Sequence, residues 1–216
     1  MDKKRTTSKL IYLFMEKIGT KIDPYKIKRF VDFTFILIEN SIVNLDKLHN
    51  IYFDYYNDMI TNEIALTDIT NDKKVLHIGS GSIPVTSILI TKKTGAQVVG
   101  IDNNPDSIKK GKSCILKNNY SDKIQLLNED AESFQVNEFD VIIVSHGVKP
   151  IKKILDHISK SMKESALVIY RTSSDPNGEI SNNDKFIKEI FNIDRIVAQK
   201  KNALLISILL KKEPKK

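Results

Sequence analysis

Apolar residues in the first third of the chain recur at the spacing of amphipathic helices. The stretch SKLIYLFMEKI (residues 8–18) fits one helix, and residues 24–43 fit a second that starts at a proline. A third helical stretch covers residues 45–69, with a break predicted near His49–Asn50. We therefore predict a small N-terminal helical subdomain over residues 1–70.

From residue 73 onward, strands and helices alternate. Apolar strands are predicted over residues 73–79, 96–102, 123–130, 139–147, 165–172, 193–200 and 202–212. Helices are predicted over residues 84–95, 105–119, 150–162 and 182–191. This alternation predicts an α/β domain with a parallel sheet covered on both faces, and the last two strands leave no room for a helix between them. Residues 71–216 therefore resemble the Rossmann-like fold of class I S-adenosylmethionine (SAM) methyltransferases, with seven mostly parallel strands.

Composition limits the classes of function. The 216 residues are 41% hydrophobic and 28% charged, no stretch is apolar enough to span a membrane, and the basic start lacks the apolar region of a signal peptide. The lone cysteine, Cys114, excludes an internal disulfide, so we expect a cytoplasmic protein. The net charge is +7, but the lysine and arginine residues form no basic stripe interleaved with aromatic residues. Nucleic acid is therefore not an expected partner.

A glycine turn, Gly79-Ser80-Gly81, follows the first predicted strand. Ligands of doubly wound sheets lie across the carboxyl ends of the strands, and glycine lets the backbone approach them closely. Ile83 and Pro84 stand where a dinucleotide fingerprint has its third glycine. The turn predicts a nucleotide-like ligand and disfavours a dinucleotide bound through its pyrophosphate.

Acidic residues follow the next two predicted strands. Asp102, with Asn103 beside it, ends the second strand, where a carboxylate can accept hydrogen bonds from both hydroxyls of a ribose. Asn104 is a candidate cap of the next helix. Asp130 and Ala131 follow the third strand, where SAM enzymes commonly contact the adenine amino group; a solvated acidic loop is the alternative. The glycine turn, the candidate ribose-binding acid and the candidate adenine-binding loop follow one another in this order along the chain. This order favours SAM over NAD as the ligand.

The loop after the fourth strand begins with Ser145 and His146. Methyltransferases that act on amino groups of nucleobases or glutamine usually carry Asn/Asp-Pro-Pro-Tyr/Phe here, so that class is disfavoured. His146 is a candidate general base, because imidazole titrates near neutrality, or a contact to adenine or substrate; a plain loop histidine is the alternative. His77, inside the first strand, is predicted to be a core residue. His49 and His157 lie on predicted helices without a pairing to Asp or Glu at ligand spacing, so no metal site is predicted.

The region of the turn resembles nicotianamine synthases of plants and archaea. These carry the signature Gly-[Ser/Gly]-Gly-Pro-Leu-Pro-[Leu/Met]-Thr-Ser/Gly-Ile. The matching residues here are Gly79, Ser80, Gly81, Pro84, Thr86, Ser87 and Ile88. The resemblance implies that the glycine turn, Pro84 and Thr86 bind SAM. Ser82 and Ile83 replace the usual Pro-Leu. Residues 139–174 also resemble the family's fourth and fifth strands, and the resemblance covers residues 50–210.

The resemblance implies a transferase that moves the 3-amino-3-carboxypropyl group of SAM to an amine and releases methylthioadenosine (MTA). A metal-chelating amino acid would be the product, and a small-molecule amine or amino acid the partner. The neutral amine is the nucleophile, so a group must take its proton. Tyr56 matches a tyrosine of the family's reaction chamber, and Glu39 is the nearest equivalent of an acidic residue on an earlier helix. Tyr56 can also be a packing residue.

Three points stay open. Arg171 can pair with a carboxylate of SAM or of the substrate, or form a surface ion pair. A SAM-dependent small-molecule methyltransferase on the same fold is the alternative function, and a SAM-binding or nucleic-acid-binding protein without activity is a third. The oligomeric state is undetermined, with a homodimer as one option.

Overall fold

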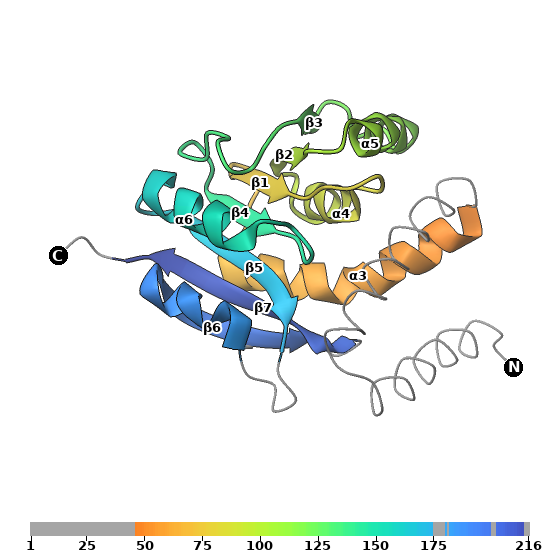
Figure 1. Cartoon of the computed structure of the whole chain (residues 1–216). Helices are drawn as coiled ribbons and strands as arrows, with labels where there is room; N and C mark the ends of the chain where they lie inside the picture. Colours follow the sequence, from red (N-terminus) through yellow and green to blue (C-terminus); the bar gives the residue numbers. More distant parts are fainter. Residues whose placement is uncertain (1–45, 175–179, 181, 200–201, 214–216) are drawn as a thin grey trace, which may run out of the picture. The chain divides into compact units, whose positions relative to one another are not determined.

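The computed structural model describes residues 46–174, 180, 182–199 and 202–213 (Figure 1). The chain divides into two compact units after residue 42, and the described residues all belong to the second. Helix α3 (Asp46–Thr67) is therefore part of the same unit as the sheet, and it runs through His49–Asn50 without the predicted break. The helices predicted over residues 8–18 and 24–43 lie outside the described residues, so the domain boundary at residue 70 stays a prediction.

Seven strands form one sheet in the order β3-β2-β1-β4-β5-β7-β6 (Figure 1). The strands are β1 (Lys74–Ile78), β2 (Gln97–Asp102), β3 (Ile124–Asn128), β4 (Val141–Val144), β5 (Leu167–Ser173), β6 (Phe191–Gln199) and β7 (Asn202–Lys212). The first five are mutually parallel, whereas β7 runs antiparallel to both β5 and β6. The predicted mostly parallel, seven-stranded sheet is confirmed.

The order of the strands reverses between β1 and β4. After β1 the chain continues to β2 and β3 on one side, and after β4 it continues to β5 on the other. The two strands are in register, with Leu76 beside Ile142 and Ile78 beside Val144, and the Ser145 N–H donates to the Ile78 carbonyl over 3.0 Å. The loops that leave β1 and β4 therefore begin side by side at the carboxyl edge, which is where ligands of such sheets bind.

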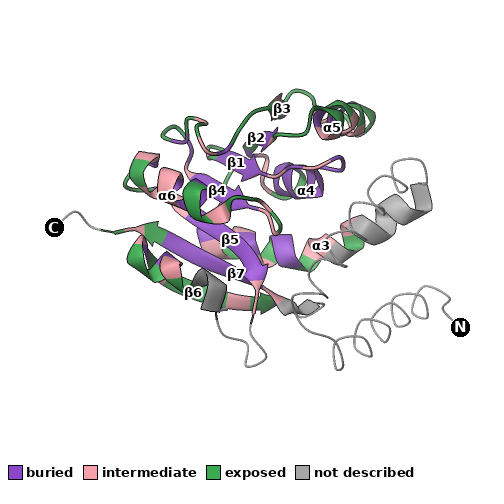
Figure 2. Ribbon diagram, in the orientation of Figure 1, coloured by how far each residue is buried: buried purple, intermediate pink, exposed green. Residues whose placement is uncertain are grey.

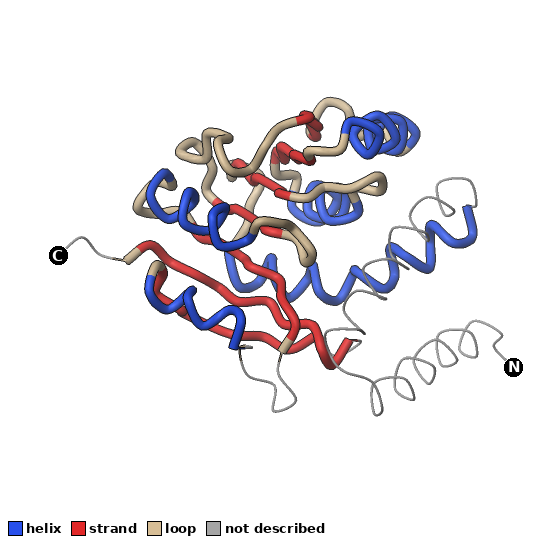
Figure 3. Tube along the Cα trace, viewed as in Figure 1, coloured by secondary structure: helices blue, strands red, loops and turns tan. Residues whose placement is uncertain are grey.

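Helices cover both faces of the sheet (Figures 1 and 3). Because βαβ crossovers are right-handed, α4 (Val85–Thr94) and α5 (Pro105–Lys117) lie on one face and α6 (Ile151–Ser161) lies on the other. Helix α3 packs against α4 and against β6 and β7. The helix predicted over residues 182–191 is a 3₁₀ helix, η1 (Asn182–Glu189), which lies between β5 and β6 in the chain.

Strand β4 and most of helix α4 are buried (Figure 2). All four residues of β4 are buried, as a central parallel strand between two layers of helices requires. In α4 the first seven residues, from Val85 to Thr91, are all buried, because the sheet covers one side of the helix and α3 packs against it as well. Gly95 ends α4 in the left-handed conformation at φ +77°.

None of the described helices combines the length and the apolarity needed to cross a membrane.

Candidate active site

The glycine turn connects β1 to α4 at the carboxyl edge of the sheet. Gly79 has a φ of +78° and Gly81 a φ of +67°, values that residues with a Cβ rarely adopt. The N–H groups of Gly79 and Ser80 both donate to the Ile101 carbonyl, over 2.9 and 3.0 Å. A Cβ on Gly79 would lie 2.6 Å from a methyl carbon of Val148 in the loop after β4. The turn is thus held to β2 on one side and lies close to the β4 loop on the other.

Asp102 lies at the end of β2 and closes the turn. Its Oδ2 accepts the Gly81 N–H over 2.9 Å, and its Oδ1 accepts the Asn104 N–H over 3.0 Å. The side chain is only partly buried, and an ionised carboxylate oxygen can accept more than one hydrogen bond. The structure therefore brings together the turn and the acid that the sequence placed at this edge.

The residues after Asp102 start helix α5. Asn103 is exposed, and the Asn104 side chain accepts the N–H groups of Asp106 and Ser107 over 2.9 and 3.3 Å. Pro105 occupies the first helical position, where its missing N–H costs nothing. The predicted cap is confirmed.

The loop after β3 carries Asp130 and Ala131. The Asp130 side chain is exposed and its Oδ1 accepts the Glu132 N–H over 2.9 Å, whereas Ala131 is buried in the core beside α6. The side chain of Asn128 donates to the Asp102 carbonyl over 2.9 Å. The ends of β2 and β3 are thereby joined at the edge that carries the turn.

His77 links helix α4 to the loop after β4. Its Nδ1 lies 3.0 Å from the Ser87 hydroxyl on α4, and its Nε2 lies 2.8 Å from the Ser145 hydroxyl. Burial, and secondly the positive charge of Arg171, lowers the pKa of His77 to about 3. The imidazole is therefore neutral, with one nitrogen donating and the other accepting. The prediction that His77 is a core residue is confirmed, since it is 2% exposed.

His146 is the next residue of the β4 loop and is partly buried. Its Nε2 lies 3.2 Å from the hydroxyl of Ser173, the last residue of β5. Ser145 and His146 thus connect the β4 loop to two different places, the interior through His77 and the end of β5 through Ser173. Whether either residue contacts a ligand stays a prediction.

Arg171 lies on β5, and its side chain is buried in the protein and not on the protein surface. It is 3% exposed, and its Nε and Nη2 donate to both carboxylate oxygens of Glu63 over 2.8 and 2.6 Å. Its Nη1 donates to the Thr86 hydroxyl over 2.9 Å. The ion pair is therefore a buried one, and direct contact of Arg171 with a substrate carboxylate stays a prediction.

Glu63, Ser207 and Gln199 extend this ion pair into a buried chain of hydrogen bonds, and none of the three was identified as a site residue from the sequence. The Ser207 hydroxyl donates to Glu63 Oε1 over 2.7 Å, and Gln199 Nε2 donates to the Ser207 hydroxyl over 2.9 Å. All three are buried. The available signal was a charge at an apolar position, since Glu63 lies among the apolar residues of MITNEIAL and Arg171 lies at the end of a buried strand.

The two predicted catalytic residues differ in what the structure says of them. Tyr56 lies on α3 and is partly buried, seven residues before Glu63, so the two residues lie near the same face of the helix about two turns apart. Glu39 lies outside the described residues. Among the residues that are described, no group of three or more His, Cys, Asp or Glu side chains is placed to hold a metal ion.

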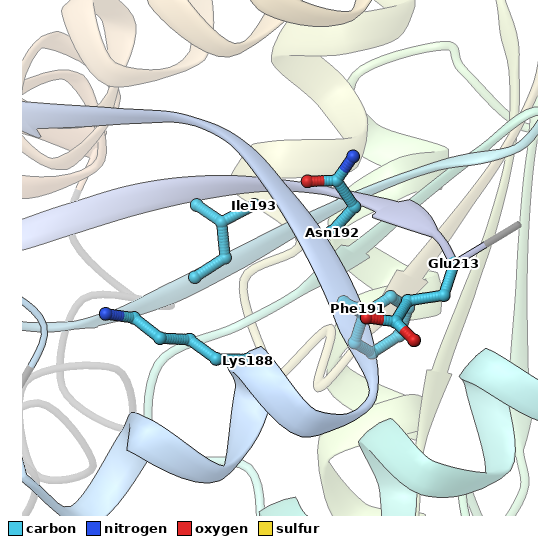
Figure 4. A pocket seen from close by; sticks show the side chains of 5 residues that line it. All are labelled: Lys188, Phe191, Asn192, Ile193 and Glu213. Carbon is cyan, nitrogen blue, oxygen red and sulfur yellow. The ribbon is translucent and has the colours of Figure 1, made fainter.

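Figure 4 shows an open hollow lined by Lys188, Phe191, Asn192, Ile193 and Glu213. Phe191 begins β6 and pairs with Lys212 near the end of β7, whose neighbour Lys211 pairs with the first residue of β5. The hollow therefore lies at the amino ends of the parallel strands, at the edge opposite the turn, and is separate from the candidate active site.

A family model described as a methyltransferase domain matches residues 69–211. Among solved structures, a glutamate-to-glutamine variant of the nicotianamine synthase MtNAS aligns with a TM-score of 0.71 and 22% identity, covering 99% of this chain and 78% of that chain. MtNAS in complex with MTA and tNA gives a TM-score of 0.70 at 22% identity, with coverage of 96% and 76%. Magnesium protoporphyrin IX methyltransferase of Synechocystis with bound SAH gives 0.59 at 12% identity, with coverage of 75% and 83%.

A curated relative is similar over a shorter stretch. L-histidine 2-aminobutanoyltransferase of Yersinia pestis is 23% identical over 120 residues, which make up 56% of this chain and 45% of that protein. The match thus spans less than half the length of the relative. Together, the comparisons confirm the class I SAM-dependent methyltransferase fold and the resemblance to nicotianamine synthases that the sequence predicted.

Proposed function

Because the chain belongs to the methyltransferase-domain family, we propose that the protein is a SAM-dependent transferase whose donor lies over the turn Gly79-Ser80-Gly81. The observation that carries the proposal is the hydrogen bond from the Gly81 N–H to Asp102, which joins the turn to the acid at the end of β2. Asp102 would accept the ribose hydroxyls on its remaining acceptor positions.

The residues around the turn fit such a donor. Side chains of the β4 loop fill the space beside Gly79, so that glycine lets the turn lie against this loop and keeps both at the proposed donor site. Ser80 is 3% exposed, and its hydroxyl has no hydrogen-bond partner within the described part of the chain. In the proposed complex Asp130 and Ala131 face the adenine, Ser145 and His146 line the β4 side, and Asn103 lies next to the ribose.

We propose transfer of the 3-amino-3-carboxypropyl group as the reaction. SAM supplies a sulfonium: an amine nitrogen bonds to the γ-carbon of its aminocarboxypropyl arm while the carbon–sulfur bond breaks and its electron pair leaves with MTA. The amine must reach this carbon and lose its proton. Tyr56, with Glu39 in the predicted subdomain, would hold the amine and relay that proton. The similarity to MtNAS and to the aminobutanoyltransferase of Yersinia pestis favours this reaction.

The acceptor in this proposal is a small-molecule amine or amino acid. Its product would carry several amine and carboxylate groups, so that metallophore biosynthesis is the proposed role. A cytoplasmic location and a homodimer complete the proposal. Methyl transfer to a small molecule is the second candidate, and the description of the matching family favours it.

The test is to identify the nucleoside product. Purified protein is incubated with SAM and an amine panel that includes glutamate, histidine and SAM itself, and the products are separated by chromatography with mass detection. We expect MTA together with a new acceptor adduct, and a Tyr56→Phe protein of normal melting temperature that has lost most of its turnover. S-adenosylhomocysteine as the sole product would establish methyl transfer instead. If SAM fails to raise the melting temperature, both enzymatic proposals are wrong.

A further inference from the structure

The buried ion pair connects three elements around the candidate active site. Glu63 comes from α3 and Arg171 from β5, and their side chains are 1% and 3% exposed. Arg171 also binds Thr86 in the first turn of α4. The planar guanidinium fixes the direction of each hydrogen bond, so Glu63 and Thr86 are held at defined places on either side of it.

The signature residues Thr86 and Ser87 both point into the protein. Thr86 is 1% exposed and binds Arg171, and Ser87 is 0% exposed and binds His77, which in turn binds Ser145. Two adjacent hydroxyls at the start of α4 therefore connect the helix to α3 through one contact and to the β4 loop through the other. Both hydroxyls are thus engaged with side chains of the protein interior.

The buried ion pair between Glu63 and Arg171 is not well explained by a contribution to stability alone. A buried ion pair loses its hydration, and an apolar replacement of similar volume is often as stable. The pair instead fixes the geometry of the site, because Tyr56 lies on the same helix as Glu63 and the glycine turn lies three residues before the start of α4. A shift of α3 relative to α4 would change the distance between the two sides of the site.

We propose that these residues form a positioning cluster, defined as Glu63, Arg171, Thr86, Ser87, His77 and Ser145. The cluster sets α3 and the β4 loop against the turn, so that the acceptor amine and the γ-carbon of SAM meet at reacting distance. The inference rests on the proposed function, and the members act through α3 and the turn without touching the reacting atoms. It explains why Thr86 and Ser87 accompany the glycine turn.

Two threonines of α4 provide a matched test. Thr86→Val removes the hydroxyl that accepts from Arg171, whereas Thr91→Val removes a buried hydroxyl of the same helix that donates to the Ala96 carbonyl over 3.1 Å. Thr91→Val should lower the melting temperature by about 2–4 °C, and Thr86→Val by roughly twice as much, because the hydrogen bond it loses comes from a charged donor. Only Thr86→Val should lower kcat, by about tenfold, because reactivity depends steeply on alignment.

Further measurements separate positioning from damage to the fold. SAM affinity by calorimetry should stay within about threefold in both variants, because the Thr86 hydroxyl is engaged with Arg171 and the Thr91 hydroxyl with the Ala96 carbonyl. Thr86→Ser, which keeps the hydroxyl, should restore kcat. An unchanged kcat in Thr86→Val, or an equal fall in Thr91→Val, overturns the inference. If the wild type releases S-adenosylhomocysteine and no MTA, the proposed reaction is wrong. The positioning role is then tested separately, by measuring kcat for methyl transfer in Thr86→Val, Thr86→Ser and Thr91→Val.

Discussion

Protonation of His77 should make the fold sensitive to mild acid. The folded protein lowers the pKa of this imidazole from 6.5 to about 3, chiefly by burial and then by the charge of Arg171. In the unfolded chain the imidazole is exposed and regains a pKa near 6.5. Between pH 6.5 and pH 3 the unfolded state therefore binds more protons than the folded state, and the free energy of unfolding falls as the pH falls through this range.

The expected magnitude follows from the difference between the pH and the unfolded pKa. Each unit below pH 6.5 costs about 1.4 kcal/mol, so His77 alone should lower the free energy of unfolding by about 2 kcal/mol between pH 7 and pH 5. For a domain of marginal stability this is a substantial part of the total. The loss should continue until about pH 3, where the folded imidazole also binds its proton.

Urea unfolding at pH 7 and pH 5, at constant ionic strength, measures this loss. The comparison is with His77→Gln, whose amide can donate and accept between Ser87 and Ser145 but does not titrate. The variant will be less stable at pH 7, yet its change between the two pH values should be smaller by about 2 kcal/mol. Equal pH dependence in both proteins would refute the buried neutral imidazole, whatever the other carboxylates and histidines contribute.

Three substitutions at the turn test the proposed donor site. Gly79→Ala should cost more than about 1 kcal/mol in urea unfolding and weaken SAM binding, because the φ of +78° is strained for alanine and its Cβ would lie 2.6 Å from Val148; a stable variant of full affinity would contradict the tight turn. Asp102→Asn should raise the Kd for SAM by about 30-fold in calorimetry, since the amide offers fewer acceptors to the ribose and to the Gly81 N–H; unchanged affinity would remove the ribose role. Asn104→Ala should cost about 1 kcal/mol through loss of the cap and leave the Kd for SAM unchanged, so it serves as the control for Asp102.

Local patterns were enough to predict the fold and the turn. Alternating apolar strands and helices predict a parallel sheet, and the positions of Asp102 and the glycine turn after successive strands place both at one edge. These inferences need only the neighbours of each residue in the chain. The 3₁₀ geometry of η1 was missed because apolar spacing does not distinguish a 3₁₀ helix from an α-helix of similar length.

The positioning cluster could not be predicted in the same way. Glu63 and Arg171 are 108 positions apart, and Arg171 and Thr86 are 85 apart, so no local pattern links them. A charged side chain in an amphipathic segment is expected on the solvent side, and only the placement of α3 against α4 and the antiparallel strands makes Glu63 internal. Its partner is determined by tertiary packing, which a single sequence does not display.

The hydrogen bond between Asp102 and the Gly81 N–H has a consequence for how a donor would enter the site. Asp102 holds the turn closed through its own carboxylate, so the backbone that receives the ligand is ordered beforehand. Association then requires little ordering of the loop, and the entropy lost on binding belongs mainly to the incoming molecule. Backbone amides of the turn should accordingly exchange slowly with solvent deuterium in the free protein, with only a small gain in protection when SAM is added.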